Sequence, residues 1–396
     1  MPGERPLRIL LSIHHRLDRD SGAAGVVMRI AEEYRLLGHQ ARVLSHDDLP
    51  PWARDRAGFL FPLLLARQVT RWRPDVVDAS SGDGWLAFSQ GMPARPLCVT
   101  HSHGLEHLSS ASEIEEAASS GRRLALAKRL WRHGLRLKLV ARSFAAADLA
   151  LVLNDAEATC LEQRLGVAAD AIERIALGTD HAGVPIRVSG RAPAGVVQIG
   201  AYSRRKGVQV TARAMTAILG ERADATLTFI GTGVPRETVL ADYPAHLHGR
   251  IEVVLRYANA QLPALLEPHS ICLMPSLFEG YGISKIEAMA CGLAVVTSDD
   301  GGACADVVDG VNGLVVPRGD ATALAAAVRR LFDDPQEAAA LARTSRITAA
   351  ERSWATVAQA RLALYRKHAR SPAGVAAPVQ PKIRRGFEAL PGLARD

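Results

Sequence analysis

The 396-residue chain is longer than one hydrophobic core usually supports, so we expect two domains. Its 48% hydrophobic and 22% charged residues are typical of a globular protein, and its five scattered cysteines, with no Cys-x-x-Cys pair, argue against a disulfide framework and a zinc knuckle. The net charge of +7 agrees equally well with a nucleic-acid, membrane or phosphorylated partner, so charge alone does not choose among them.

The first part of the chain predicts a strand–helix–strand unit. The N-terminus runs directly into an apolar strand at 7–13 without a signal-peptide layout, and no stretch approaches the roughly 18 apolar residues of a membrane-spanning helix, so we expect a cytoplasmic protein. An amphipathic helix follows within 21–40, with Gly38 as its stop, and then a strand at 41–45. Further apolar strands are predicted at 75–80, 96–101 and 149–154.

The same pattern starts again after a segment rich in Gly and Pro at 177–195. A strand at 194–200 is followed by a helix over 204–218. Later strands are predicted at 225–231, 251–256, 271–276, 293–298 and 313–317. Strands that alternate with helices are typical of a parallel α/β sheet, which binds ligands at the carboxyl ends of its strands. We therefore expect the site in a cleft between two such domains.

The C-terminal part is predicted to be helical over 321–334 and 335–370, and the proline-containing remainder is expected to be a mobile tail. The expected division is 1–180 for an N-terminal acceptor domain, 181–193 for a linker, 194–350 for a C-terminal donor domain, 351–370 for helices that could cross back to the first domain, and 371–396 for the tail.

Two glutamates, Glu279 and Glu287, stand eight positions apart in the stretch 275–302, PSLFEGYGISKIEAMACGLAVVTSDDGG. One interpretation is local: Ser284 begins a helix and Glu287 completes a capping box. The other is a ligand site, because a helix N-terminus attracts phosphate, glycines let a ligand approach the backbone, and carboxylates accept hydrogen bonds from sugar hydroxyls. The second interpretation predicts a ligand that contains both phosphate and sugar.

Two further groups of polar residues follow predicted strands. Arg204, Arg205 and Lys206 suit a diphosphate, because a guanidinium there lies beside an ammonium, although such a triplet can also be a solvated surface. The histidine cluster at 100–107, THSHGLEH, resembles the start of a metal site, but no second group with ligand spacing follows it. The alternative for this cluster is a loop with one or two useful histidines.

Two more stretches favour ligands or surfaces. The turn SGAAG at 21–25 lacks the G-x-G-x-x-G order of a dinucleotide site, but it can admit a ligand to backbone amides. The stretch 121–142, GRRLALAKRLWRHGLRLKLVAR, has eight Lys or Arg residues, no acidic residue and interleaved leucines. It predicts a basic amphipathic helix that either meets an anionic membrane or partner, or packs its apolar face in the core.

Together these stretches resemble the retaining, nucleotide-sugar-dependent glycosyltransferases of family four, the glycosyl transferases group 1. That family has the GT-B fold, an α/β architecture of two Rossmann-like parallel-sheet domains that face each other across a cleft. The resemblance is densest at 275–302 with the later DVVDGVNGLVV, where Glu279 and Glu287 match the Glu-x7-Glu pair of the family. It covers the chain from residue 7 to about residue 365.

The resemblance implies a role for each matching residue. Glu287 would bind the donor ribose, Glu279 and His103 would be catalytic residues that face the donor sugar, and Arg205 and Lys206 would bind the diphosphate. The remaining expected contacts come from the second-domain turn of Gly280, Tyr281, Gly282 and Ile283 and from the first-domain loop of Gly22, Ala23, Ala24 and Gly25, which would close on the diphosphate and acceptor.

The chain departs from the family pattern at two positions. Ala201 stands where many members have a phosphate-binding arginine, so we expect Arg205, or with less support Arg204, to replace it. Leu177 stands where the family has an asparagine before Gly-x-Asp, and we interpret it as structural.

The implied reaction moves a sugar from a UDP- or GDP-linked donor to an acceptor with retention of anomeric configuration. It needs no cofactor and no metal, since Asp18-x-Asp20 lies in the first loop and not where a metal-binding motif belongs. The acceptor stays open among a glycan, a lipid-linked intermediate and a small molecule. We expect no nucleic-acid partner, and any peripheral contact with the inner face of a membrane would use 121–142.

Two other functions remain as alternatives. One is a metal-dependent hydrolase built on His101, His103 and His107. The other is a non-catalytic protein that binds nucleotide sugars or anionic surfaces, in which the basic stretch 121–142 is the working part.

Overall fold

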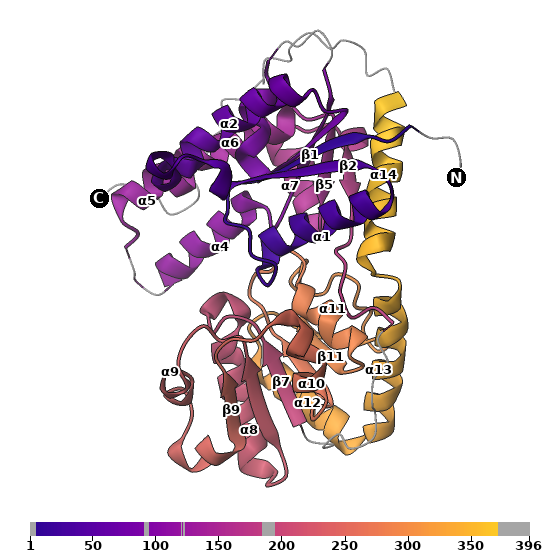
Figure 1. Ribbon diagram of the computed structural model, residues 1–396. Helices are drawn as coiled ribbons and strands as arrows, with labels where there is room; N and C mark the ends of the chain where they lie inside the picture. Colours follow the sequence, from indigo (N-terminus) through magenta and orange to yellow (C-terminus); the bar gives the residue numbers. More distant parts are fainter. Residues whose placement is uncertain (1–4, 91–94, 120, 122, 184–194, 371–396) are drawn as a thin grey trace.

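The computed structural model describes residues 5–90, 95–119, 121, 123–183 and 195–370 (Figure 1). It contains two six-stranded parallel sheets, each flanked by helices, and this confirms the predicted α/β class. The expected tail at 371–396 and most of the expected linker lie outside the described residues. No helix in the described ranges is long and apolar enough to span a bilayer.

The first sheet has the strand order β2-β1-β3-β4-β5-β6. Its strands are β1 (Arg8–Ile13), β2 (Gln40–Ser45), β3 (Val76–Ser80), β4 (Leu97–His101), β5 (Leu149–Val152) and β6 (Ile172–Arg174). The first five match the predicted apolar runs within two residues. The edge strand β6 was not predicted, because its three residues are partly exposed and form no apolar run.

The helices of the first half are α1 (Gly22–Leu36), α2 (Ala57–Trp72), α3 (Trp85–Phe88), α4 (Glu106–Ser119), α5 (Leu126–Leu130), α6 (Arg136–Ala145) and α7 (Asp155–Leu165). The amphipathic pattern of α1 is confirmed, because its apolar face is buried and Gly38 follows it with a left-handed φ of 86°. The basic stretch is helical only from Leu126, and a π-helical turn (Trp131–Leu135) joins α5 to α6.

The second sheet has the order β12-β11-β10-β7-β8-β9. Its strands all match predicted runs: β7 (Gly195–Ile199), β8 (Thr226–Ile230), β9 (Ile251–Val254), β10 (Ile271–Met274), β11 (Ala294–Ser298) and β12 (Leu314–Val316). Its helices are α8 (Val208–Glu221), α9 (Arg236–Leu240), α10 (Leu262–Leu266), α11 (Ile283–Ala290), α12 (Ala321–Asp333) and α13 (Pro335–Ala350).

The helix predicted over 204–218 starts later than expected. Arg204–Lys206 form a 3-10 turn, and α8 begins only at Val208. Gly207 separates the two with a left-handed φ of 69°, and a Cβ at this position would lie 1.8 Å from the carbonyl oxygen of Pro275. A side chain at this position would clash, so only glycine fits. Its left-handed φ separates the 3-10 turn from the start of α8.

The last helix, α14 (Trp354–Arg370), runs back alongside the first sheet (Figure 1). The hydroxyl of Tyr365 lies 3.0 Å from that of Tyr34 on α1. The guanidinium of Arg361, which is 2% exposed, lies 2.5 Å from Asp78 on β3. For the domain division we propose boundaries at 1–180 and 194–350, with α14 as the segment that crosses back.

Candidate functional site

A pocket of about 620 Å³ lies between the carboxyl ends of the two sheets. Both halves of the chain line it, and most of the residues singled out in the sequence are brought together there: Gly22, Ala23, His103, Arg205, Lys206, Glu279, Gly280, Tyr281, Gly282, Ile283 and Glu287. Ala24 and Gly25 do not line the pocket. They are buried in the first turn of α1, where a Cβ on Gly25 would lie 2.5 Å from the carbonyl oxygen of Arg19.

Glu279 lies in the turn between β10 and α11, with its carboxylate held by two cations. Its Oε2 accepts from Lys206 Nζ, and its Oε1 lies 3.3 Å from Arg205 Nη1. Its backbone amide donates to Asp300 Oδ2 at 2.8 Å, which fixes the turn. Burial opposes ionisation, but Lys206 and Arg205 outweigh it and lower the pKa of Glu279. The carboxylate is therefore ionised at neutral pH.

Glu287 lies on α11, and its environment differs from that of Glu279. Its side chain is buried, and its Oε1 accepts from Asn259 Nδ2 at 2.5 Å. Burial raises the pKa of Glu287 to about 7, because no cation pairs with it directly. This group titrates near neutral pH. When it is ionised both of its oxygens are acceptors, whereas the protonated form also carries an O–H donor.

The capping-box interpretation of Glu287 is wrong. Helix α11 starts after Gly282, which has a left-handed φ of 78°, and no side chain caps its N-terminus. A Cβ on Gly282 would lie 2.8 Å from the sulfur of Met274, so the close packing of this turn requires glycine. The amides of Ile283 and Ser284, the first two of α11, have no carbonyl partner within the helix, and both residues line the pocket.

The basic triplet divides between the pocket and the surface. Arg205 and Lys206 line the pocket, whereas Arg204 points toward Glu116, with 3.9 Å between Arg204 Nε and Glu116 Oε1. Gly200 follows β7, and the Lys206 side chain passes close to its backbone. A Cβ on Gly200 would lie 3.3 Å from Lys206 Cε. The geometry therefore favours Arg205 over Arg204 as the substitute for the arginine that is missing at Ala201.

The first-domain histidines form a hydrogen-bonded row instead of a metal cluster. His101 Nδ1 lies 2.5 Å from Asp78 Oδ1, and His101 Nε2 lies 2.9 Å from His103 Nε2. Ser80 Oγ is 3.0 Å from the same His103 nitrogen. His107 lies apart, and burial lowers its pKa to about 4. Within the part of the chain that the structure describes, no group of three His, Cys, Asp or Glu side chains could hold a metal ion.

His103 is the member of this row that reaches the pocket. Burial and the neighbouring His101 hold the pKa of His103 well below its ordinary value, so its imidazole is neutral. Asp78 anchors the other end of the row. Burial would raise the pKa of Asp78, but Arg361 and His101 outweigh burial and lower it. The row thus runs from an ionised aspartate in the core to a neutral imidazole at the pocket.

The two halves of the pocket touch at a pair of glycines. A Cβ on Gly280 would lie 2.7 Å from the Cα of Gly104, and Asn154 Nδ2 donates to the carbonyl oxygen of Gly280 at 2.7 Å. The turn that carries Glu279 therefore rests on the loop that carries His103. This contact puts both residues on one wall of the pocket.

Several pocket residues were not found from the sequence. Arg29 on α1 is 7% exposed and binds Asp180 through Nε, at 2.7 Å from Oδ2. Asp20 Oδ1 accepts from the backbone amide of Asn259 at 3.2 Å and joins the first-domain loop to the second domain. Arg29 lies within the predicted helix and Asp20 in the loop before it, and in each case the partner is far away along the chain. Such pairs become visible only in the folded structure.

Lys285, inside the glutamate stretch, was also missed. Its ammonium is fully buried and donates to the carbonyl oxygens of Tyr281, at 3.0 Å, of Gly302, at 3.3 Å, and of Ala305. Burial lowers the pKa of Lys285 to about 8. Lys285 therefore ties the pocket turn to the loop after β11. The ring of Tyr281 is likewise buried, and its hydroxyl donates to Asp306, so its backbone and not its hydroxyl faces the pocket.

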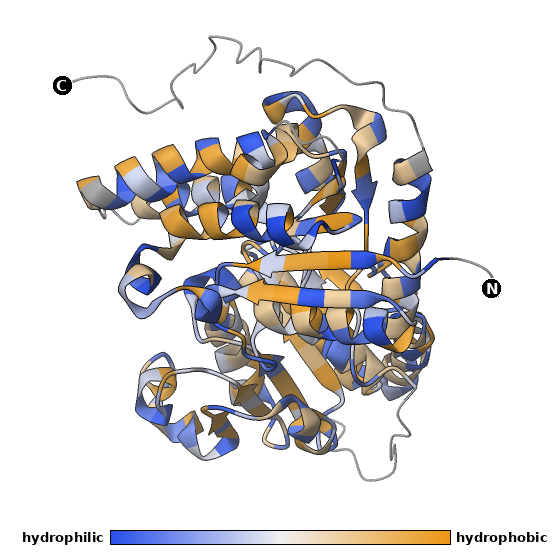
Figure 2. Ribbon diagram, turned by 45° about the horizontal axis from the view of Figure 1, so that its top comes forward, coloured by the Kyte–Doolittle hydropathy of each residue, from blue (hydrophilic) through white to orange (hydrophobic). Residues whose placement is uncertain are grey.

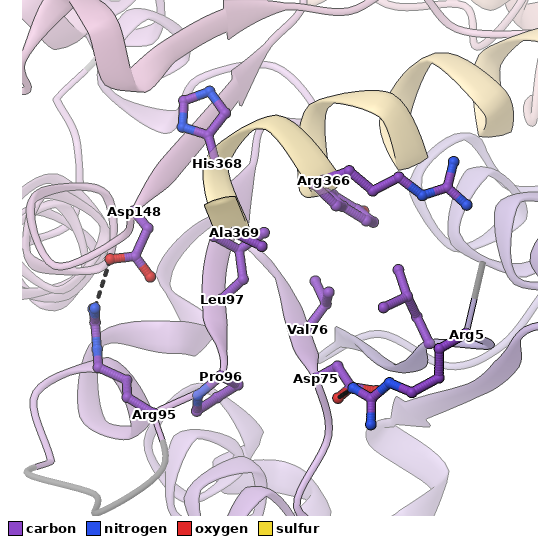
Figure 3. Close-up of a pocket in the computed structure, with 12 residues that line it drawn as sticks. Arg5, Asp75, Val76, Arg95, Pro96, Leu97, Asp148, Arg366, His368 and Ala369 are labelled. Atoms are coloured by element: carbon purple, nitrogen blue, oxygen red, sulfur yellow. Dashed lines mark hydrogen bonds and ion pairs between the residues drawn. The ribbon is translucent and has the colours of Figure 1, made fainter. Parts of the chain in front are cut away.

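A second, smaller pocket of about 360 Å³ lies between the N-terminal ends of β3 and β4 and the end of α14 (Figure 3). Two of its arginines are already paired: Arg5 Nη2 lies 2.5 Å from Asp75 Oδ1, and Arg95 Nη1 lies 2.5 Å from Asp148 Oδ1. None of the residues singled out in the sequence lines it. The larger pocket is therefore the candidate site.

Comparison with known proteins gives matches over both halves of the chain. The model of the family described as Glycosyltransferase Family 4 matches residues 21–182, and that of Glycosyl transferases group 1 matches residues 193–334. A glycogen synthase from Mycobacterium tuberculosis (strain ATCC 25618 / H37Rv) is 29% identical over 302 residues, which are 74% of this chain and 69% of that protein.

Solved structures share the fold at low sequence identity. A sucrose-phosphate synthase from Thermosynechococcus elongatus matches with a TM-score of 0.75 at 20% identity, over 91% of this chain and 98% of that chain. HepE from Anabaena, in complex with UDP-glucose, matches with a TM-score of 0.65 at 19% identity, over 91% of this chain and 100% of that chain. These likenesses confirm the expected arrangement of two sheets facing a cleft.

Proposed function

Because the chain belongs to glycosyltransferase family 4, has the GT-B fold and is a nucleotide-sugar-dependent glycosyltransferase, we propose that it transfers its sugar with retention of anomeric configuration and without a metal ion. The observation that supports this most is the composition of the pocket. Two cations and two carboxylates of the second domain face one neutral imidazole of the first domain.

In the proposed complex the donor lies along the second-domain wall. The diphosphate binds Arg205, Lys206 and the free amides at the start of α11, since these groups offer positive charge and N–H donors at one place. The ribose hydroxyls donate to Glu287, which Asn259 orients. HepE, which shares the fold, binds UDP-glucose, so a UDP-linked hexose is the first donor to test, followed by GDP-linked sugars.

The donor sugar then lies against the wall where Glu279 and His103 meet. His103 Nε2 is engaged by His101 and Ser80, which leaves Nδ1 for a sugar hydroxyl. Glu279 is ionised and can hold a second hydroxyl and stabilise positive charge that develops on the sugar ring. Since Glu279 is already paired with two cations, we do not assign it the role of nucleophile.

The proposed transfer is a same-face attack. The bond between the anomeric carbon and the diphosphate breaks, the acceptor oxygen bonds to the same face of that carbon, and the departing phosphate oxygen takes the acceptor proton. Lys206 and Arg205 stabilise the negative charge of the leaving group, which is the role that a metal ion has in other transferases. The acceptor, whether glycan, lipid-linked intermediate or small molecule, approaches from the loop of Gly22 and Ala23.

Thermal stabilisation by a panel of nucleotide sugars tests the donor site. We expect one UDP- or GDP-linked sugar to raise the unfolding temperature, and Glu287→Ala to lose most of this effect. Glu162→Ala, at an exposed position on α7, is the matched control and should keep it. Proton NMR of the product then tests the stereochemistry. An inverted anomeric centre, or turnover that EDTA abolishes, would contradict the proposal.

A further inference from the structure

One end of the first domain exposes large apolar side chains together with arginines. Thirteen large hydrophobic side chains are exposed in the described ranges, and six of them lie in 51–72 and 126–135. We call these six side chains and the exposed arginines of the same two segments the basic–apolar face. Leu126 and Leu130 are 68% and 65% exposed. The six are Trp52, Phe59, Leu63, Leu126, Leu130 and Leu135.

The two segments form one continuous surface. The ring centroids of Phe59 on α2 and Trp131 in the π-helical turn are 3.9 Å apart, and a Cβ on Gly58 would lie 2.9 Å from the Trp131 ring. Figure 1 shows α2, α5 and α6 at the end of the first domain that lies opposite α14. In Figure 2, orange bands alternate with blue along the helices that project at this end.

The charges of this face are almost all positive. On α2 and the turn before it, Arg56, Phe59, Leu63 and Arg67 follow one another at spacings of three and four residues, so they share one side of the helix. Arg56, Arg67 and Arg129 are exposed, and none of them forms an ion pair with another described residue. The segment 51–72 has one acidic residue, and 121–142 has none. Unneutralised arginines beside exposed leucines favour a ligand surface that is both anionic and apolar.

The basic–apolar face is also coupled to the candidate site. Helix α4 starts at Glu106, three residues after His103, and Glu106 Oε1 lies 2.9 Å from Arg136 Nη2 at the start of α6. Ser110 Oγ lies 2.6 Å from His133 Nδ1 in the π-helical turn. The loop that lines the pocket and the face are therefore parts of one packed unit.

We propose that the basic–apolar face docks the protein on a bilayer that contains anionic lipids. The apolar side chains enter the boundary between headgroups and acyl chains, and the arginines contact lipid phosphates. Leucine, phenylalanine and tryptophan side chains lie beside arginines on this face. Such a mixture matches a lipid surface, where acyl chains lie beneath anionic headgroups. The proposal does not depend on sugar transfer, because docking needs no donor.

Co-sedimentation with vesicles tests the docking. The wild-type protein should bind vesicles of phosphatidylcholine with phosphatidylglycerol, should bind pure phosphatidylcholine much more weakly, and should be released by salt. Each arginine near the surface contributes roughly a fivefold change in partitioning. Arg56→Gln with Arg129→Gln should therefore weaken binding by at least tenfold, and Leu126→Ser with Leu130→Ser should weaken it by a similar factor.

Two substitutions away from the face serve as matched controls. Leu36→Ser and Arg213→Gln replace exposed residues on α1 and α8 and should leave vesicle binding unchanged. Stabilisation by a nucleotide sugar shows that each face variant remains folded. The proposal is overturned if the wild-type protein does not prefer anionic vesicles or if the double variants bind as well as the wild type. It is equally overturned if the face variants abolish a dimer and leave vesicle binding intact.

Discussion

Replacing Glu287 by glutamine should stabilise the protein at alkaline pH and weaken donor binding at the same time. The carboxyl group is 6% exposed, and burial raises its pKa from 4.5 to about 7. A raised pKa in the folded state means that the group stabilises the fold fully below pH 4.5 and loses this contribution as the pH rises through 7. At about 1.4 kcal/mol per pH unit, the gap from 4.5 to about 7 corresponds to roughly 3 kcal/mol at pH 8.

Thermal and urea unfolding at pH 5 and pH 8 measure this effect. Glu287→Gln keeps an oxygen that can accept from Asn259, so the variant loses the charge and little of the packing. We expect it to be more stable than the wild type by up to about 3 kcal/mol at pH 8, with most of this advantage absent at pH 5. Glu162→Gln, at an exposed position, should change neither value.

Calorimetric titration with the donor completes the test. If the donor binds only when Glu287 is ionised, the wild-type Kd should weaken by about tenfold for each pH unit below 7, and the Kd of the variant should be weaker and independent of pH in this range. A variant with no gain in stability at pH 8, or with the wild-type pH dependence of Kd, would refute the assignment of a costly buried charge to Glu287.

The other predictions concern the walls of the pocket. Lys206→Met should weaken donor binding by more than about tenfold in calorimetry, because it removes the cation next to Glu279, and an unchanged Kd would contradict its role. Asp78→Asn leaves Arg361 buried without its charged partner and should cost about 3–5 kcal/mol in urea unfolding; a cost below about 1 kcal/mol would refute this. Gly280→Ala puts a methyl group 2.7 Å from the Cα of Gly104 and should weaken donor binding, whereas Gly220→Ala, which meets no atom within 4 Å, should not.

The fold was predictable because its sheets are parallel and buried. Strands covered on both faces are continuous apolar runs, and eleven such runs in the sequence became strands. The edge strand β6 has no such run and was missed. The start of α8 was misplaced because Gly207 was interpreted as part of a helix, whereas it has a left-handed φ and packs against Pro275, where a Cβ would clash.

The candidate site was predictable where motif and topology coincide. Residues in the segments that follow strands, such as His103, Lys206 and Glu279, meet at one pocket because the carboxyl ends of the strands face the cleft. The capping box failed because Gly282 already turns the backbone into α11. Asn259, the partner of Glu287, begins a short 3-10 turn (Asn259–Gln261) that no period or spacing in the sequence distinguishes.

The most direct test of the account is where the donor binds. Hydrogen–deuterium exchange with and without UDP-glucose, or with the nucleotide sugar that stabilises the protein best, measures this on the wild-type chain. The account predicts slower exchange at 200–207 and 279–287, the segments that carry Lys206, Glu279 and Glu287. Protection confined to the smaller pocket around Arg5 and Arg95, with exchange at 279–287 unchanged, would contradict it.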